Sequence, residues 1–484
     1  MVYPPDDSFW FHLRMGNQVY EQGRRENADR LAYSPEGRDI SAYPPLLHYA
    51  FGYLCKLLKG LKIRVSCFQL ALRFGLLVTA AAAASAAYLF DIPVLMTLLV
   101  FFSTPIIFFR ILYYGFRGEL LSFMCFPLWL ATLLKEEWGF MAGPVFLFMI
   151  FASKTACAVM EAALYLMPPV LVWNPHLYSA FLSLSLAGLG LLVYYRQKKQ
   201  EWYFPLLNAL IGLFIKQPRQ RYPLLHNNRL TTEEEKSVTP RYFFFLLPCL
   251  ALLICCPFIT GFPGAHLGLL LFWGYFLLLS LLSKRYMIYQ AILLDILLIR
   301  LVTHLPAPGL RFILMGLILG LNLFFMLYLY RKKRGKRIGI YQALDWIGQH
   351  VKKSDNRSGL PPLIISWWNH GHIISGYKGY RNFWDSYFPG TAAVLKKEEI
   401  FDEIIGGTSG GLSFCKGHDL ELAVLPRFRC RHLSLRHRIL WESDGITVVL
   451  LYAAFDGHKS MWRDFYQFSK SNIPSFQSIV SAAN

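Results

Sequence analysis

Between residues 67 and 330 the chain is a nearly continuous succession of apolar runs, and this feature constrains its fold more than any other. A helix needs roughly 20 apolar residues to cross the hydrocarbon core, and only helices and closed barrels satisfy their backbone groups there. The runs lie near 67–90, 93–112, 119–134, 139–152, 156–173, 178–195, 203–215, 242–259, 263–283, 286–303 and 307–330. They predict an α-helical polytopic membrane protein with about 11 spans, several of them short.

The composition agrees with a membrane protein. Hydrophobic residues make up 55% of the 484 residues and charged residues only 16%, whereas soluble domains carry about 25% charge. These values exclude a disordered chain, a coiled coil and a secreted disulfide scaffold. The net charge of +19 suits basic residues that flank spans and face anionic lipid. We do not expect nucleic acid as a partner, because no basic patch with interleaved aromatic residues stands clear of the spans.

The sequence divides into three predicted parts. Residues 1–66 are polar and aromatic, and within them residues 45–59 are typical of a helix that lies in the membrane interface. Residues 67–330 form the predicted transmembrane bundle. After the basic run 331–337 the composition becomes mixed, so residues 331–484 are predicted to form a C-terminal soluble domain of mixed α/β structure.

The first informative polar segment is residues 6–14, which place Asp6, Asp7, His12 and Arg14 beside aromatic residues. Carboxylates at a membrane surface can hold a divalent metal, and Arg and His suit a phosphate. The alternative interpretation is a solvated N-terminal segment.

Two further polar segments join apolar runs. In residues 113–119, Glu119 begins a predicted helix, where negative charge is favoured for purely structural reasons. In the functional interpretation, Glu119 is a metal ligand and Arg117 contacts a phosphate. The loop 216–241 contains three consecutive carboxylates within residues 231–235, and such a charge run is usually a solvated face.

The fourth segment has two adjacent tryptophans, Trp367 and Trp368, and continues as Asn-His-Gly-His. Residues 364–366 before them predict a buried strand, so the polar groups follow a strand end, a usual place for binding residues. We predict a ligand or peptide pocket walled by the two tryptophans. A metal site at His370 and His372 is weakly supported, because no Cys or carboxylate stands beside the pair.

The order of these segments resembles the catalytic subunit of oligosaccharyltransferase, a GT-C membrane glycosyltransferase. Residues 366–373 read SWWNHGHI, similar to the SWWDxGHxI of archaeal single-subunit members, with Asn in place of Asp. Residues 7–14 resemble the family's Asp-aromatic-His-x-Arg segment, and residues 43–48 its Tyr-Pro-Pro-Leu segment. Residues 118–119 fall at its second external acidic motif, and residues 231–235 at its TIxE loop.

The resemblance implies an enzyme that moves an oligosaccharide from a polyprenyl phosphate or pyrophosphate carrier to Asn in Asn-x-Ser/Thr. It also implies a Mn²⁺ or Mg²⁺ ion held by Asp7, Glu119 and Glu235, with Asp6 and Glu234 as alternative ligands in their loops. Asp7 and Glu235 would in addition engage the acceptor amide.

The remaining predicted contacts concern the two substrates. Trp367, Trp368 and Asn369 would hold the Ser/Thr hydroxyl of an acceptor polypeptide, and Arg14 and Arg117 would bind the phosphate of the lipid-linked donor. The resemblance implies a multi-pass protein, in the plasma membrane, whose active site and C-terminal domain face outside.

One conflict concerns topology. The family places the Glu119 and Glu235 loops on one face, whereas five apolar runs separate them here. We therefore expect one span fewer within 139–215.

Two other functions are compatible with parts of the sequence. One is a different lipid-linked GT-C glycosyltransferase, whose acceptor is a lipid, a cell-wall polymer or Ser/Thr. The other is a transporter or flippase for lipid-linked sugars, which would explain the spans but not the tryptophan motif or the soluble domain.

Overall fold

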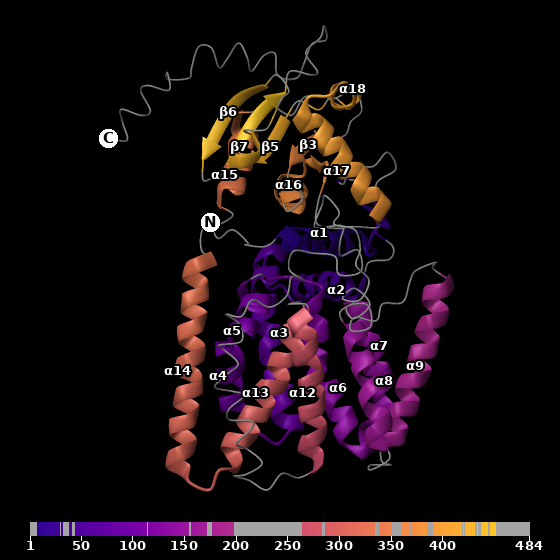
Figure 1. Cartoon of the computed structure of the whole chain (residues 1–484), viewed down its shortest axis with the longest axis vertical. Coiled ribbons are helices and arrows are strands. Elements are labelled where there is room, and N and C mark those ends of the chain that lie inside the picture. The colour runs from indigo at the N-terminus through magenta and orange to yellow at the C-terminus, as the bar shows by residue number, and fades with distance from the viewer. Residues whose placement is uncertain are drawn as a thin grey trace. The chain divides into compact units, whose positions relative to one another are not determined.

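The chain falls into two compact units in the computed structural model. The residues that it describes are 7–29, 31, 38–40, 44–113, 115–153, 156–171, 177–197, 264–282, 286–333, 338–350, 361, 363–366, 370–384, 391–418, 420, 422–430, 433, 437–443 and 446–451. A helical unit comprises the described parts of 4–27 and 40–334. A C-terminal unit comprises those of 28–39 and 335–484 (Figure 1). The first 66 residues thus contribute to both units.

The helices of the helical unit follow the apolar runs. They are α3 (Cys67–Leu89), α4 (Val94–Ser103), α5 (Pro105–Ile107), the π-helical turn η1 (Phe108–Tyr113), α6 (Glu119–Leu134), the 3-10 turn η2 (Glu136–Met141), α7 (Ala142–Ala152), α8 (Cys157–Leu171), α9 (Tyr178–Gln197), α12 (Gly264–Leu282), α13 (Met287–His304) and α14 (Pro308–Lys333). The predicted helical runs are confirmed wherever they fall on described residues. The runs 203–215 and 242–259 lie outside the described residues.

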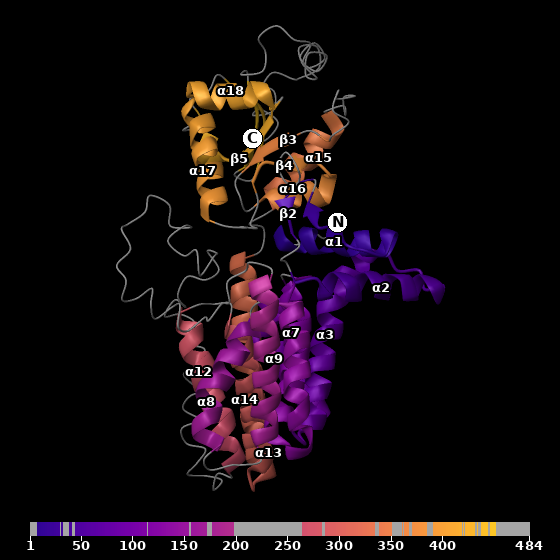
Figure 2. The ribbon, with the colours of Figure 1, turned by 90° about the vertical axis from the view of Figure 1, so that its right-hand side faces the viewer.

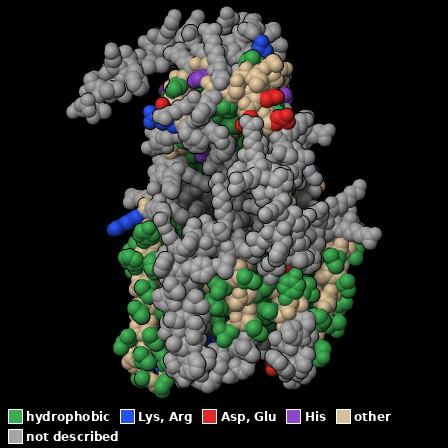
Figure 3. All heavy atoms as spheres, in the orientation of Figure 1, with side chains coloured by type: hydrophobic (Ala, Val, Ile, Leu, Met, Phe, Trp, Pro, Cys, Tyr) green, Lys and Arg blue, Asp and Glu red, His purple; other side chains and the backbone are tan. Residues whose placement is uncertain are grey.

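The surface of this helical unit is suited to lipid. Among the described residues, three helices are long and apolar enough to cross a membrane, at Cys67–Leu89, Met287–His304 and Pro308–Arg331. Hydrophobic side chains gather on the described helices at the face shown in Figure 3, and Phe312 on α14 is 81% exposed. A soluble monomer rarely exposes such large apolar patches. The chain is therefore an integral membrane protein with several spans.

Two helices precede the first span. Helix α2 (Leu46–Gly60) confirms the helix predicted at 45–59, and it buries its Leu47 and Phe51. Helix α1 (Asp7–Gln22) was not predicted. Its aromatic and aliphatic residues follow one another without a clean apolar stripe, yet they are buried by neighbouring elements.

Small residues let α1 and α2 approach closely. A Cβ added at Gly52 of α2 would lie 2.6 Å from the Cβ of Val19 and 2.9 Å from the backbone oxygen of Gly16. In the same way, a Cβ at Gly75 of α3 would lie 2.5 Å from the carbonyl oxygen of Ile111 in η1. These glycines fix how α1, α2 and the segment before α6 fit together.

Four helices lead from Glu119 back to the end of the unit where they began. The backbone N–H of Gly143, early in α7, donates to Ser183 Oγ near the start of α9 at 2.9 Å, so α7 and α9 begin at the same end. Helices α6 and α8, which precede α7 and α9 respectively in the chain, run in the opposite direction (Figure 1). Gln197 therefore lies at the same end of the bundle as Glu119. Whether the run 203–215 crosses again concerns residues outside the described part of the chain.

The C-terminal unit is built on a five-stranded mixed sheet of order β4-β3-β5-β7-β6. Its strands are β3 (Leu363–Ser366), β4 (Arg381–Asn382), β5 (Leu422–Pro426), β6 (His437–Ser443) and β7 (Ile446–Leu451). Strand β3 pairs in parallel with β4 and β5, whereas β7 pairs antiparallel with β5 and β6. The predicted mixed α/β character and the buried strand at 364–366 are both confirmed.

Helices flank this sheet. They are α15 (Ile338–His350), α16 (Gly371–Lys378), α17 (Thr391–Gly406), α18 (Ser409–Gly417) and the short α19 (Arg427–Cys430). Helices α15 and α16 lie on one side and α17 and α18 on the other (Figure 2). A small hairpin of β1 (Ala28–Asp29) and β2 (Arg38–Asp39) belongs to this unit. The backbone N–H of Asn382 donates to the carbonyl of Leu31 at 2.9 Å, which ties this early segment to β4.

Candidate active site

Two of the predicted polar segments meet at His12. The backbone N–H of Gly118 donates to Nε2 of His12 at 3.2 Å, across 106 residues of sequence. His12 lies on α1 and is 2% exposed. Because Gly118 immediately precedes Glu119, this bond holds the start of α6 against α1. The structure therefore brings the 6–14 segment and the 113–119 segment together.

An aromatic cluster holds the loop before α6 in place. The ring of Phe116 is completely buried, with its centroid 4.5 Å from that of Phe51 and 6.2 Å from that of His12. Gly115 has φ of +73°, and a Cβ there would lie 3.3 Å from the ring of Phe9. Only glycine adopts this conformation without strain. The loop thus turns beneath α1 in one defined conformation.

The charged residues of this loop take contrasting positions. Arg117 is 6% exposed, so its guanidinium is held within the protein. Glu119 is the first residue of α6 and is half-buried. A carboxylate there faces the partial positive charge of the helix N-terminus. One buried cation and one oriented carboxylate in three residues can bind a phosphate and a hard metal ion respectively.

A second buried histidine extends the site. Nδ1 of His12 lies 2.9 Å from Nε2 of His48, whose Nδ1 lies 3.3 Å from Nη1 of Arg25. Arg25 also donates through Nη2 to the carbonyl of Ile40 at 3.1 Å. Arg25 can only donate, so its contact with His48 is a hydrogen bond only when Nδ1 of His48 is unprotonated. Gly118 likewise requires an unprotonated Nε2 on His12. Both outer nitrogens of the histidine pair therefore face donors.

This arrangement disfavours a charged imidazole. Burial lowers the pKa of His48 well below its ordinary value of 6.5, and the neighbouring His12 and Arg25 lower it further. An imidazole nitrogen of His12 or His48 that accepts a hydrogen bond would lose that bond on protonation. His48 is therefore neutral at pH 7 and acts as an orienting group for His12.

A pH dependence of stability follows. Below pH 6.5 the unfolded chain protonates His48 and the folded chain does not, so unfolding becomes more favourable by up to about 1.4 kcal/mol per pH unit. We expect the thermal midpoint of the purified protein to fall between pH 6.5 and 5, and this fall to be shallower in His48→Gln. The control is His418→Gln in the C-terminal unit. Equal slopes for His48→Gln and the unmodified protein would contradict the assignment.

The other predicted site residues divide into two groups. Asp7 begins α1, and although its side chain is not described, its backbone lies five residues from His12, about 7.5 Å along the helix axis. Positions 7 and 14 share one face of α1 two turns apart, and Arg14 is half-buried. Six predicted residues lie outside the described part of the chain: Asp6, Glu234, Glu235, Trp367, Trp368 and Asn369.

The described structure of the C-terminal unit continues on both sides of the tryptophan motif. Strand β3 ends at Ser366, which is fully buried, and α16 begins at Gly371. His370 and His372 are 7% and 2% exposed. Within the described ranges no three His, Cys, Asp or Glu side chains are grouped as a metal site would require. Of the proposed metal ligands, only Glu119 has a described side chain.

Sequence reasoning missed several residues that shape the site. His48 and Phe116 contact His12, Arg25 contacts His48, and Gly115 sets the loop conformation. The signal that was available was the histidine ending the Tyr-Pro-Pro-Leu-Leu-His segment. A histidine on an apolar helix face is more often a core residue than a functional one, and only its contact with His12 distinguishes it.

Comparisons with known proteins show a shared fold. No family model and no curated sequence matches the chain. The structure of the archaeal oligosaccharyltransferase AglB from Archaeoglobus fulgidus, bound to an inhibitory peptide and dolichol-phosphate, matches with a TM-score of 0.52 at 13% identity. The match covers 87% of this chain and 65% of AglB. This chain thus spans under two thirds of the length of that relative.

A second protein matches over nearly its full length. ArnT from Cupriavidus metallidurans matches with a TM-score of 0.55 in the apo state and 0.54 bound to undecaprenyl phosphate, at 13% and 12% identity. Each match covers 93% of this chain and 94% of ArnT. Together these structures show that the chain shares its fold with AglB and with ArnT.

Proposed function

We propose that this protein is a membrane glycosyltransferase that moves an oligosaccharide from a polyprenyl phosphate or pyrophosphate to Asn in Asn-x-Ser/Thr of polypeptides. The observation that carries the proposal is the bond between His12 and Gly118. It joins the helix that begins at Asp7 to the segment containing Arg117 and Glu119, on a fold shared with an oligosaccharyltransferase and with a protein bound to undecaprenyl phosphate.

Each charged residue has a role in this proposal. The reaction forms a bond between the acceptor amide nitrogen and the anomeric carbon, breaks the bond from that carbon to the phosphate oxygen, and releases the amide proton. Arg117 and Arg14 bind the phosphate that departs with both bond electrons. Asp7 and Glu235 orient the acceptor amide and weaken its conjugation, so that its nitrogen becomes a better nucleophile.

We propose that the carboxylates of these loops bind a divalent cation. Mn²⁺ and Mg²⁺ prefer oxygen ligands, and Glu119 presents a half-buried carboxylate beside the contact between His12 and Gly118. Asp7 and Glu235 would complete the ligand set. The bound ion would neutralise negative charge on the leaving phosphate. The His12–His48 pair contributes by holding α1 and the start of α6 in register.

The acceptor pocket is proposed at the end of β3. Trp367 and Trp368 would form apolar walls, and Asn369 would accept a hydrogen bond from the Ser/Thr hydroxyl. A pocket built around that bond discriminates strongly against acceptors that lack the hydroxyl, because its polar groups would then be unpaired.

The test is peptide glycosylation by the purified protein. We expect transfer from a lipid-linked oligosaccharide, with Mn²⁺, to an Asn-x-Thr peptide and none to the matched Gln-x-Thr peptide, measured by mass spectrometry of the peptides. Asp7→Ala and Glu235→Ala should each remove the activity. Transfer that survives both substitutions would refute the site, and no transfer from any polyprenyl-linked donor would refute the function.

A second candidate function is favoured by the length of the match to ArnT. This chain covers 94% of ArnT but only 65% of AglB. A lipid-linked GT-C glycosyltransferase with a different acceptor would use the same phosphate and carboxylate loops without the hydroxyl pocket. It predicts that both peptides stay unmodified while the donor sugar appears on a lipid, a cell-wall polymer or a Ser/Thr acceptor.

A further inference from the structure

We propose that α2 lies in the membrane interface as a binding surface for anionic phospholipid headgroups, separate from the candidate active site. The first observation is an apolar stripe on its exposed side. Tyr53, Leu57 and Leu61 follow one another at intervals of four residues and are 53%, 58% and 61% exposed. Ile63 extends the stripe and is 46% exposed. The opposite side of the helix packs against α1 through Gly52.

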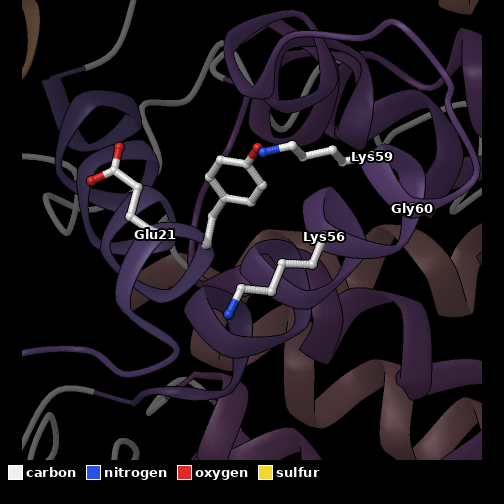
Figure 4. A pocket seen from close by; sticks show the side chains of 5 residues that line it. Glu21, Lys56, Lys59 and Gly60 are labelled. Atoms are coloured by element: carbon white, nitrogen blue, oxygen red, sulfur yellow. The ribbon is translucent and has the colours of Figure 1, made fainter.

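Basic residues lie on the other faces of α2, with Lys56 next to Tyr53 and Lys59 toward Tyr20 of α1. Lys56 and Lys59 project from α2 next to a shallow hollow of about 660 Å³, lined also by Tyr20, Glu21 and Gly60. Figure 4 shows the two lysines extending from α2 and Glu21 extending from α1. Nζ of Lys59 lies 5.7 Å from the ring of Tyr20, and Nζ of Lys56 lies 5.6 Å from that of Tyr53.

The positive charge continues beyond the helix. Lys62 and Arg64 follow in the link to α3, and both are exposed. Four cations therefore lie within nine residues, and the hollow contributes one carboxylate, that of Glu21. Because its basic residues outnumber its carboxylate, this surface attracts anions.

The orientation of α2 within the helical unit places the stripe at a lipid boundary. Helix α2 leads within seven residues into α3, which is long enough to span the membrane. Figure 2 shows α1 lying over α2, and α2 running crosswise to the spanning helices and projecting past α3. The side of α2 opposite α1 thus faces the level of the spans, where lipid surrounds them.

An anionic membrane explains both the apolar stripe and the basic residues of α2. An apolar stripe on one face and basic residues on the others are the pattern of a helix that lies in the interface, with its stripe among the acyl chains and its polar face at the phosphates. The long stems of the lysines can bury against lipid while their ammonium groups reach the headgroups. A soluble protein partner would instead have to compete with the surrounding bilayer for contact with the exposed leucines.

The experiment measures lipid binding to the full-length protein by native mass spectrometry from detergent, with phosphatidylglycerol and phosphatidylcholine as the probes. We expect phosphatidylglycerol to bind more tightly. The double variant Lys56→Gln/Lys59→Gln should weaken phosphatidylglycerol binding roughly thirtyfold, from about 1 kcal/mol per basic residue. Its phosphatidylcholine binding should not change.

The matched control is Lys397→Gln/Lys416→Gln on α17 and α18 of the C-terminal unit, which should bind both lipids as the unmodified protein does. Hydrogen exchange of residues 53–63 in nanodiscs provides a second measurement that does not depend on variants. Exchange should be slower in discs containing phosphatidylglycerol than in pure phosphatidylcholine. Equal affinity for the two lipids, an equal loss in the control variant, or exchange that is insensitive to the headgroup would overturn the proposal.

Discussion

Glu119→Gln is expected to reduce glycosyl transfer by roughly a hundredfold or more while leaving the fold intact. The substitution keeps the shape of a half-buried side chain at the start of α6 and removes only its charge. If that charge holds the cation that stabilises the leaving phosphate, its loss falls on the transition state, where one electrostatic group is typically worth two to three orders of magnitude, or about 2.7–4 kcal/mol. The measurement is the turnover number at saturating donor and acceptor.

The structural explanation of Glu119 predicts a different result. A carboxylate that only favours the helix N-terminus contributes about 0.3–1 kcal/mol to stability and nothing to catalysis. Glu119→Gln would then lower the unfolding temperature slightly and leave turnover unchanged. Glu137→Gln is the matched control, because Glu137 is an exposed acid in η2, beyond the other end of α6. A Glu119→Gln variant with more than half of the original turnover would rule out a direct role.

Gly52→Ala is expected to cost about 1–3 kcal/mol of stability, the usual range for overpacking a closely packed interior. The added methyl would lie 2.6 Å from the Cβ of Val19 and 2.9 Å from the backbone oxygen of Gly16. Neither is the far end of a flexible side chain, so α1 and α2 must separate. The contact of 2.9 Å between His12 and His48 joins the same two helices. We therefore also expect transfer activity to fall.

Gly60→Ala provides the control on the same helix. Nothing lies within 4 Å of a Cβ at Gly60, so alanine should be tolerated and should raise the helix propensity by up to about 1 kcal/mol. Thermal unfolding of the two variants beside the unmodified protein tests both expectations. If Gly52→Ala unfolds at the same temperature as Gly60→Ala, the close crossing of α1 and α2 is not as tight as described.

The parts of the fold that follow from local pattern were predictable. Apolar runs such as 67–90 and 119–134 became α3 and α6 with ends within one residue of the prediction, because a helix in lipid must satisfy its own backbone. The strand at 364–366 was recognised by its short apolar run. Helix α1 was missed because its aromatic residues are buried by α2, α3 and the loop at Phe116, and no such burial can be seen in a local window.

The site shows the same division. Sequence patterns pointed to Asp7, Arg14, Arg117 and Glu119 as chemically suited side chains, because each residue type carries its chemistry wherever it is placed. Which of them lie together depends on contacts between distant segments.

The sequence by itself thus determined that this chain is a helical membrane protein, and it predicted which polar segments carry chemically suited side chains. The reason is that hydrophobic length and side-chain chemistry are local properties. Only the tertiary structure decided that the segments of His12 and Gly118 meet, that His48 is held neutral beside Arg25, and that α2 presents its apolar stripe on the side opposite α1. These depend on close approaches at Gly16, Gly52 and Gly115, where the absence of a side chain has a consequence only once the opposing surface is in place.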